Sequence, residues 1–376
     1  MRTKFTIIYA IGAVFLFLFP VFTDAAEDIS EEEIFDAKIL EILEEKETVR
    51  EDGVKTLQQN IRLKGESGSW EEKEFTVYGI LELEVVGSNA YKKGDKVLVN
   101  YAKDVRGNDV FYIVDYVRRG ALYLLAFIFS LVIIAIGKWK GLKAILSLAV
   151  SFIIIMKFIV PRILNGDNPV IIGVAGSFII LVFIIYITEG FNWKSHLGIV
   201  SILTALLITS FISTFFTSLT RLTGMAQEET IFLASFGQGV INFNGLLLAA
   251  ILIGTLGVLD DVVISQIEAV AQIKEANPTL SPSKVFTHAF NIGKTHLGAL
   301  TNTLFLAYAG AALPLLLLFG IKQPPFLSFS QVINNEIVAT EIVRAFAGNI
   351  GLALSVPIAT FLAAYYYKGS KVKPAK

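Results

Sequence analysis

The sequence predicts an α-helical membrane protein with about seven transmembrane helices and a small β-rich domain ahead of them. Three observations predict this fold. Charged residues make up 17% of the 376-residue chain, against about 25% in soluble proteins. The charge is unevenly divided, because residues 27–119 carry 14 Lys or Arg against 22 Asp or Glu, whereas the rest carries 18 against 11. Runs of apolar residues long enough to cross a bilayer dominate the chain after residue 120.

Residues 1–26 are predicted to be a signal peptide or a signal anchor. Arg2 and Lys4 provide a positive start, and Phe5–Phe22 is almost wholly apolar. Small residues then surround a cleavage position after Ala25, as in secretory signals. An uncleaved anchor is the alternative, since 18 apolar residues can span a bilayer. Both interpretations place the domain that follows outside the cytoplasm.

Residues 27–119 are predicted to form an extracytoplasmic β-rich domain. Runs rich in Val, Ile, Tyr and Phe, separated by Gly- and Asp-containing turns, predict strands over Ile34–Leu43, Glu74–Val86, Lys96–Tyr101 and Asp109–Val117. Several short strands in about ninety residues favour a small closed barrel of the OB or SH3-like type. A net charge of −8 repels phosphate, so nucleic acid is not an expected partner. The domain is then either a folded spacer or a docking module for a protein partner.

Residues 120–366 are predicted to form the transmembrane domain. Seven apolar runs of 17 to 23 residues predict its spans: Ala121–Gly137, Leu142–Val160, Pro169–Ile187, Leu197–Leu219, Val240–Leu259, Leu297–Phe319 and Ala345–Tyr365.

The distribution of Lys and Arg predicts the orientation. With the β-rich domain outside, the inner segments 138–143, 188–196 and 260–296 and the tail carry 11 Lys or Arg, and the outer segments carry 6. The positive-inside rule therefore predicts a cytoplasmic basic tail, residues 367–376, in a multi-pass protein of the plasma membrane. Arg118 and Arg119, on the outer side, count against this orientation.

Two segments do not follow the pattern of one helix per apolar run. Thr230–Ile241 is too short to span and is followed or interrupted by residues that disfavour helix: Gly237, Gln238, Gly239, Asn242 and Asn244. It is predicted to be a broken or re-entrant helix that lines a cavity, or else a helix lying on the membrane surface. Phe326–Arg344 contains a second short amphipathic stretch before the last span.

The fifth predicted span carries a candidate transport site. Polar residues at i, i+4 and i+7 share one helical face, and two glycines extend that face and permit close packing: Asp261, Ser265, Glu268, Gly254 and Gly257. Ionisable groups inside a membrane are costly, so they indicate function by default. Asp260 and Asp261 have a simpler alternative interpretation, that they mark the point where the helix leaves the bilayer.

The sixth span adds His296, Asn302 and Thr303. A histidine accepts a proton near neutral pH, so we expect the Asp261 face to lie against His296 and Asn302 and to exchange protons with them. A solvated interfacial histidine is the alternative.

The last predicted span begins at an ion pair and continues with small residues. Glu341 and Arg344 are spaced i, i+3, which predicts a structural ion pair, because paired charges are buried at lower cost. Gly348 and Gly351 predict close packing of this helix against a neighbour.

These residues carry a resemblance to a known family. The segments Gly254-Thr-Leu-Gly-Val-Leu-Asp260-Asp261, Thr301-Asn302-Thr-Leu-Phe-Leu-Ala-Tyr308-Ala-Gly310, Glu341-Ile-Val-Arg344 and Gly348-Asn-Ile-Gly351 resemble the YibE/F-like family of bacterial multi-pass membrane proteins. The resemblance covers most of the chain and implies a bacterial plasma-membrane protein, but it adds little on chemistry. The family pattern has a single Asp in the glycine-rich helix, so which of the two acids matters here stays open.

Two classes of function fit this sequence. A permease or ion-coupled transporter needs titratable groups at depth and a broken helix, and both have candidates. A non-catalytic assembly or regulatory protein needs an outer docking domain and a polar packing face. We expect no enzyme, because the Gly-x-Ser-x-Gly, His-Glu-x-x-His and Gly-Lys-Ser/Thr motifs are missing, and we expect no catalytic residues, metal or cofactor. The expected partners are the lipid bilayer, a small solute or ion, a protein at the outer domain, and further subunits of a homo- or hetero-oligomer.

Overall fold

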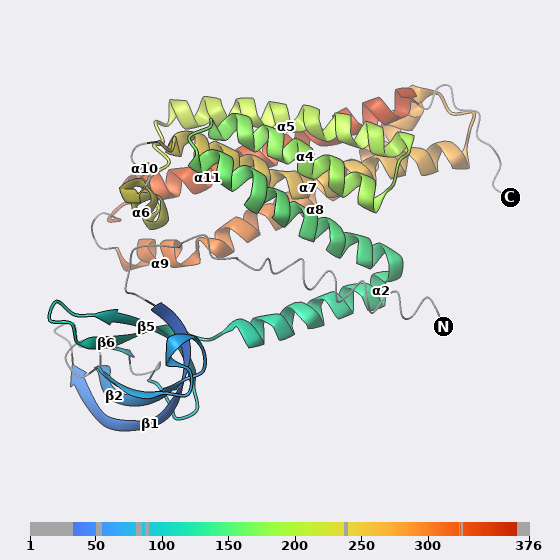
Figure 1. Ribbon diagram of the computed structural model, residues 1–376. Coiled ribbons are helices and arrows are strands. Elements are labelled where there is room, and N and C mark those ends of the chain that lie inside the picture. Colours follow the sequence, from blue (N-terminus) through green and yellow to red (C-terminus); the bar gives the residue numbers. More distant parts are fainter. Residues whose placement is uncertain are drawn as a thin grey trace, which may run out of the picture. The chain divides into compact units, whose positions relative to one another are not determined.

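The structure, a computed structural model of the chain, describes residues 33–49, 55–79, 85–86, 90–236, 240–322, 324 and 326–366. The predicted signal segment, the basic tail, and Gly237, Gln238 and Gly239 lie outside the described residues. The described residues divide into two compact units, a sheet unit before Ile133 and a helical unit from Ile133 onward. Figure 1 shows the strands of the first unit and the long helices of the second.

The sheet unit is a curled antiparallel sheet. Its strands are β1 (Glu33–Val49), β2 (Lys55–Gly65), β3 (Glu74–Tyr78), β4 (Val85–Val86), β5 (Lys96–Lys103) and β6 (Asp109–Tyr116). They pair in the order β3-β2-β1-β5-β6, and β4 also pairs with β2. Two register shifts in β1, after Ile39 and after Ile42, add local twist to the long β1–β2 hairpin. The OB or SH3-like assignment stays a prediction.

Alternating side chains form the core of the sheet unit. Ala37, Ile39, Leu63, Val97 and Val99 are 0 to 1% exposed, and their period of two matches the pleat. The two ends of the pairing path, β3 and β6, meet where Phe75 stacks on Phe111 with ring centroids 4.4 Å apart. Strand β2 was missing from the sequence prediction, because Gln58 and Gln59 interrupt its apolar pattern although both are buried.

Ion pairs join the sheet to the helix that follows it. The guanidinium of Arg119 makes a bidentate contact with the carboxylate of Asp36 in β1, with Nη1 and Oδ1 3.1 Å apart. Arg118 pairs with Asp115 at 2.6 Å. Both arginines that oppose the positive-inside count are therefore compensated by acids of the sheet unit.

The helical elements account for most of the remaining chain. They are α2 (Arg119–Ile154), the π-helix η3 (Ile155–Ile159), α3 (Val160–Leu164), α4 (Pro169–Thr188), α5 (Trp193–Leu219), α6 (Glu228–Phe236), α7 (Phe243–Ala276), α8 (Pro282–Ala311), α9 (Leu313–Ile321), α10 (Phe329–Asn334) and α11 (Glu336–Tyr366). Among the described residues, five helices are long and apolar enough to cross a membrane, or six if α8 and α9 form one bent span. The chain is a membrane protein, and the count of seven spans stays a prediction.

The first candidate span explains part of this difference. It runs from Arg119 to Leu164, and 46 residues of helix extend about 69 Å, about twice the hydrocarbon thickness. Lys138 interrupts it with φ 50° and ψ −123°. Ile133 and Ile134 then pack against Leu142 and Ile145, so the helix turns sharply here. This break separates the first and second predicted spans.

Three predicted boundaries differ from the structure. Helix α7 continues 17 residues past Leu259, and α8 starts 15 residues before Leu297, so the predicted inner segment 260–296 is largely a helical hairpin. The predicted sixth span bends by 66° at Ala312, because Pro314 lacks an N–H and its ring clashes with the preceding turn. The predicted stretch Phe326–Arg344 holds α10, but its second half already belongs to α11.

Helix α7 lies at the centre of the helical unit and packs against α4, α5, α8 and α11. Small residues allow the close approaches. A Cβ at Gly351 of α11 would collide with the hydroxyl of Thr209 in α5, and one at Gly173 of α4 would lie 2.8 Å from the Cβ of Ala249 in α7. Such contacts are typical of membrane helices, where packing drives association. The outward faces carry exposed apolar side chains, as expected for contact with lipid.

Candidate functional site

The predicted polar face of α7 points outward. Asp261 and Ser265 are exposed, and Ser265 Oγ donates to the main-chain oxygen of Asp261 at 2.6 Å. Glu268 forms an ion pair with Lys194 of α5 at 2.6 Å and accepts from Gln272 at 2.9 Å. The carboxylate of Glu268 is thus held by Lys194 and Gln272, whereas Asp261 is exposed.

Asp260 is different from its neighbour. It is partly buried, and its Oδ1 is buried without a hydrogen-bond partner among the described residues. Adjacent residues of a helix point about 100° apart, which explains how one acid is exposed while the other turns inward. A buried carboxylate oxygen without a donor is a costly group, so Asp260 is the stronger functional candidate of the two.

Helix α8 meets α7 through a residue that the sequence analysis did not single out. Gln266 Nε2 donates to the main-chain oxygen of Ala289 at 2.7 Å and to Thr360 Oγ1 of α11 at 2.7 Å. Gln266 lies on the opposite side of α7 from Asp261, about 140° away. Asp261 and His296 are both exposed, and the contact between the Asp261 face and His296 stays a prediction.

The polar residues of α8 face outward as well. His296, Asn302 and Thr303 are exposed, and Thr303 Oγ1 donates to the main-chain oxygen of Ala299 at 3.1 Å. Periodicity placed these residues on recurring faces of the helix, but it could not tell which face α7 would cover.

The glycines of the predicted packing faces fall into two groups. A Cβ at Gly348 would lie 3.1 Å from Thr255 Oγ1 of α7, and one at Gly351 would collide with Thr209. A Cβ at Gly254 would lie 3.2 Å from the hydroxyl of Tyr308, but one at Gly257 would meet nothing within 4 Å. Close packing therefore involves three of the four glycines.

The predicted broken helix becomes a short helix followed by a new one. Helix α6 has nine residues and none of its described side chains is buried. Asn242 then caps α7, accepting from Gly245 N at 2.9 Å, and Asn244 Nδ2 donates to Leu222 O at 2.7 Å. Asn242 thus satisfies a main-chain N–H at the start of α7, and Asn244 satisfies a main-chain oxygen in the connection between α5 and α6.

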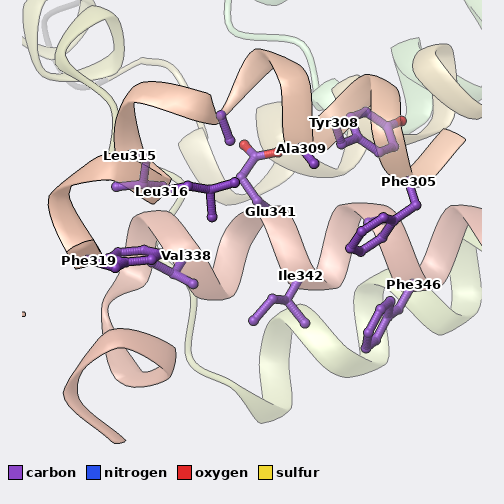
Figure 2. Close-up of a pocket in the computed structure, with 12 residues that line it drawn as sticks. Phe305, Tyr308, Ala309, Leu315, Leu316, Phe319, Val338, Glu341, Ile342 and Phe346 are labelled. Atoms are coloured by element: carbon purple, nitrogen blue, oxygen red, sulfur yellow. The ribbon is translucent and has the colours of Figure 1, made fainter. Parts of the chain in front are cut away.

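Glu341 and Arg344 form the predicted ion pair inside α11. Arg344 Nη1 lies 3.0 Å from Glu341 Oε1, and the side chains are 21% and 19% exposed. A cavity of about 220 Å³ lies beside Glu341, between α11 and the bent pair α8–α9. Figure 2 shows that apolar and aromatic side chains surround this carboxylate, which is the charged group among the described lining residues.

A second, smaller cavity of about 100 Å³ lies beside Arg344. Thr340 of α11, Gln227 just before α6, Thr230 in its first turn, and Leu246 of α7 contribute to its walls. Arg344 Nε and Thr340 Oγ1 are buried without a hydrogen-bond partner in the described part of the chain. The ion pair therefore lies next to two cavities, one at each of its partners.

Within the described residues, no group of three or more His, Cys, Asp or Glu is arranged to hold a metal ion.

A set of long apolar helices with buried hydroxyls and few charges defines a multi-span membrane protein. The family described as YibE/F-like protein matches residues 125–369, about two thirds of the chain, and the chain belongs to this family. The match covers most of the helical unit and begins within α2, so it leaves out all six strands. No curated protein and no solved structure matches the chain.

Proposed function

We propose that this protein is a permease or ion-coupled transporter of a small solute or ion, and that it is not an enzyme. The observation that carries the proposal is Asp260, a partly buried acid of the central helix with a carboxylate oxygen that lacks a donor. A buried carboxylate of this kind is stabilised when it binds a proton, a cation or a water molecule that passes through the helix bundle.

Polar groups continue from Asp260 toward Arg344 through the helical unit. Buried hydroxyls lie where α5, α7 and α11 pack together: Thr209, Ser213, Thr217, Thr255 and Ser355. Among the described residues, Ser213 Oγ and Thr217 Oγ1 have no hydrogen-bond partner. A hydroxyl without a partner is costly in the apolar interior of a membrane protein. A row of buried hydroxyls between two ionisable groups therefore supports a path for a polar solute.

We infer the orientation that the Lys and Arg count predicts, with the sheet unit outside the cytoplasm and the tail inside, in the plasma membrane. The compensated charges of Arg118 and Arg119 support this inference, because each arginine has its own carboxylate partner. The end of the bundle that holds Thr223 and Glu336 would then face outward, and the end with Lys194 and Glu268 would face inward.

The test is flux into reconstituted vesicles that contain a pH-sensitive dye. We expect the wild-type protein to move protons together with one of a panel of small solutes and ions. Asp260→Asn should reduce this pH-coupled flux at least about tenfold, whereas Asp261→Asn, its exposed neighbour, should reduce it much less. Both variants should fold and insert normally, as checked by circular dichroism and by protease protection.

Two results would contradict the proposal in different ways. A larger loss of pH-coupled flux in Asp261→Asn than in Asp260→Asn would show that Asp261, and not Asp260, is the functional acid. Wild-type vesicles that move nothing beyond empty vesicles would exclude a permease. The assembly or regulatory function would then take first place.

One observation favours that second function. Gly257, Asp261 and Ser265 on α7, and His296 and Asn302 on α8, form polar or small outward faces that hydrocarbon does not stabilise. A further subunit, of the same or another chain, would satisfy them.

A further inference from the structure

We propose that the cavity beside Arg344 binds a small planar oxyanion, such as a short carboxylate, nitrate or bicarbonate. The claim that an oxyanion binds here depends only on the geometry of the cavity. The further claim that this oxyanion is the transported substrate rests on the function proposed above.

The donors of the cavity point to a negatively charged ligand. Arg344 uses Nη1 for Glu341, and its Nε is buried without a partner among the described residues. The Nε edge of a guanidinium binds planar oxyanions through two parallel hydrogen bonds. Thr340 is 5% exposed, lies four residues before Arg344 on the same face of α11, and offers a hydroxyl that also lacks a partner.

The shape and the nearby charges agree with this chemistry. A volume of about 100 Å³ is smaller than the roughly 150 Å³ cavity that holds the six carbons of benzene, so an ion of about three or four heavy atoms fits. Leu246, Leu247 and Ala250 of α7 provide an apolar wall beside these donors. The acids Glu228 and Glu229 at the start of α6 are exposed and are absent from the described lining.

Glu341 makes the site suitable for release as well as for binding. Its carboxylate holds Nη1 from the side of the larger cavity, so the guanidinium stays neutralised when the small cavity is empty. A bound anion shares the positive charge with Glu341, which keeps binding weak enough for exchange.

The test is ligand-dependent thermal stability of the purified full-length protein in detergent. Sodium nitrate and sodium formate should raise the melting temperature in a saturable way, compared with sodium gluconate at the same ionic strength. Gluconate is too large for the cavity. Arg344→Lys keeps the positive charge but loses the two parallel N–H donors of the guanidinium. Thr340→Val removes the hydroxyl at nearly constant side-chain volume.

We expect each variant to weaken the apparent affinity for nitrate about tenfold or more, because each removes a hydrogen bond to a charged ligand. Ser147→Ala is the matched control, since it removes a buried hydroxyl of α2, one that donates to Ala144 O at 2.8 Å and lies outside the proposed path. Ser147→Ala should keep the wild-type response. An equal response to nitrate and gluconate, or an unchanged affinity in Thr340→Val, would overturn the site.

The vesicle assay separates this inference from the proposed function. Saturable nitrate binding without any flux would support the site and remove the transporter. The opposite result is a flux that Asp260→Asn abolishes and that does not respond to nitrate or formate, with no saturable binding of either ion. This result would support the transporter and exclude the anion site.

Discussion

The sheet unit and the helical unit use charge in opposite ways. In the sheet unit, ion pairs such as Arg62–Glu41 at 2.9 Å and Lys96–Glu66 at 2.6 Å lie at an exposed surface. Exposed pairs of this kind are worth about 0 to 1 kcal/mol each. In the helical unit charges are scarce and partly buried, and within the described residues Asp260 Oδ1 and Arg344 Nε have no hydrogen-bond partner. The comparison teaches that a charge in the first unit is mostly structural, whereas one in the second calls for a functional explanation.

The largest effect should come from the packing of the helical unit. In Gly351→Val the new side chain would collide with Thr209 of α5, and overpacking of this kind costs about 1 to 3 kcal/mol. We expect a clearly lower melting temperature of the helices by circular dichroism at 222 nm. Gly298→Val is the control, because a Cβ at Gly298 meets nothing within 4 Å.

The same variant tests whether the two units are independent. Trp70 belongs to the sheet unit and contacts Phe111, with ring centroids 4.7 Å apart, so its fluorescence reports on that unit once Trp139 and Trp193 are replaced by Phe. Gly351→Val should leave the Trp70 transition unchanged. A matching shift in both signals would break the comparison, because the units would then unfold together.

The next effect concerns the junction between sheet and helix. In Arg119→Ala the carboxylate of Asp36, 11% exposed, loses its bidentate partner, which we expect to cost about 1 to 3 kcal/mol. Arg118→Ala breaks an exposed pair with Asp115 and should cost about 0 to 1 kcal/mol. Denaturant unfolding followed by Trp70 fluorescence measures both. Equal losses would show that burial of Asp36 does not matter.

The accuracy of the sequence predictions follows the same division. The predicted spans Pro169–Ile187 and Leu197–Leu219 match α4 and α5 to within four residues, because there the apolar run and the helix coincide. In α7 and α8 they do not coincide, since hydropathy reports the thickness of the bilayer and a helix continues into water without a change in its hydrogen bonding. Pro314, in the first turn of α9, is the local sequence signal for the bend at Ala312.

The candidate site was predicted only in part, for a physical reason. Periodicity correctly put Asp261 and Ser265 on one face, but which neighbour covers a face depends on packing between distant segments. The cavity beside Arg344 joins α6, α7 and α11, whose contributing residues Thr230 and Thr340 are more than a hundred positions apart. No local pattern encodes such a cavity. Thr340 and Arg344 share a face of α11, but the α6 and α7 walls of the cavity join them only after folding.

The smallest effect should come from an exposed acid of the sheet unit. Asp104 lies in the turn between β5 and β6, where it accepts from the side chain of Asn108 at 2.9 Å and from the main-chain N–H groups of Asn108 and Arg106 at 2.8 Å. The hydrogen bond from the Asn108 side chain, followed by that from its main chain, lowers the pKa of Asp104 below its usual value. A lowered pKa in the folded state stabilises that state only when the carboxylate is charged.

The sign of the pH dependence follows from this shift. The contribution of Asp104 is fully present above the unfolded pKa of about 3.9 and is lost as the pH falls through the lower pKa of the folded state. Asp104→Asn should therefore be slightly less stable than wild type at pH 7, and the two should converge below about pH 4. Unfolding followed by Trp70 fluorescence at several pH values measures this difference, and the helical signal at 222 nm serves as the internal control. A difference in stability that stays constant down to pH 3 would mean that the turn depends on the shape of the Asp104 side chain and not on its charge. Asp104 would then no longer be an example of a structural charge in the sheet unit.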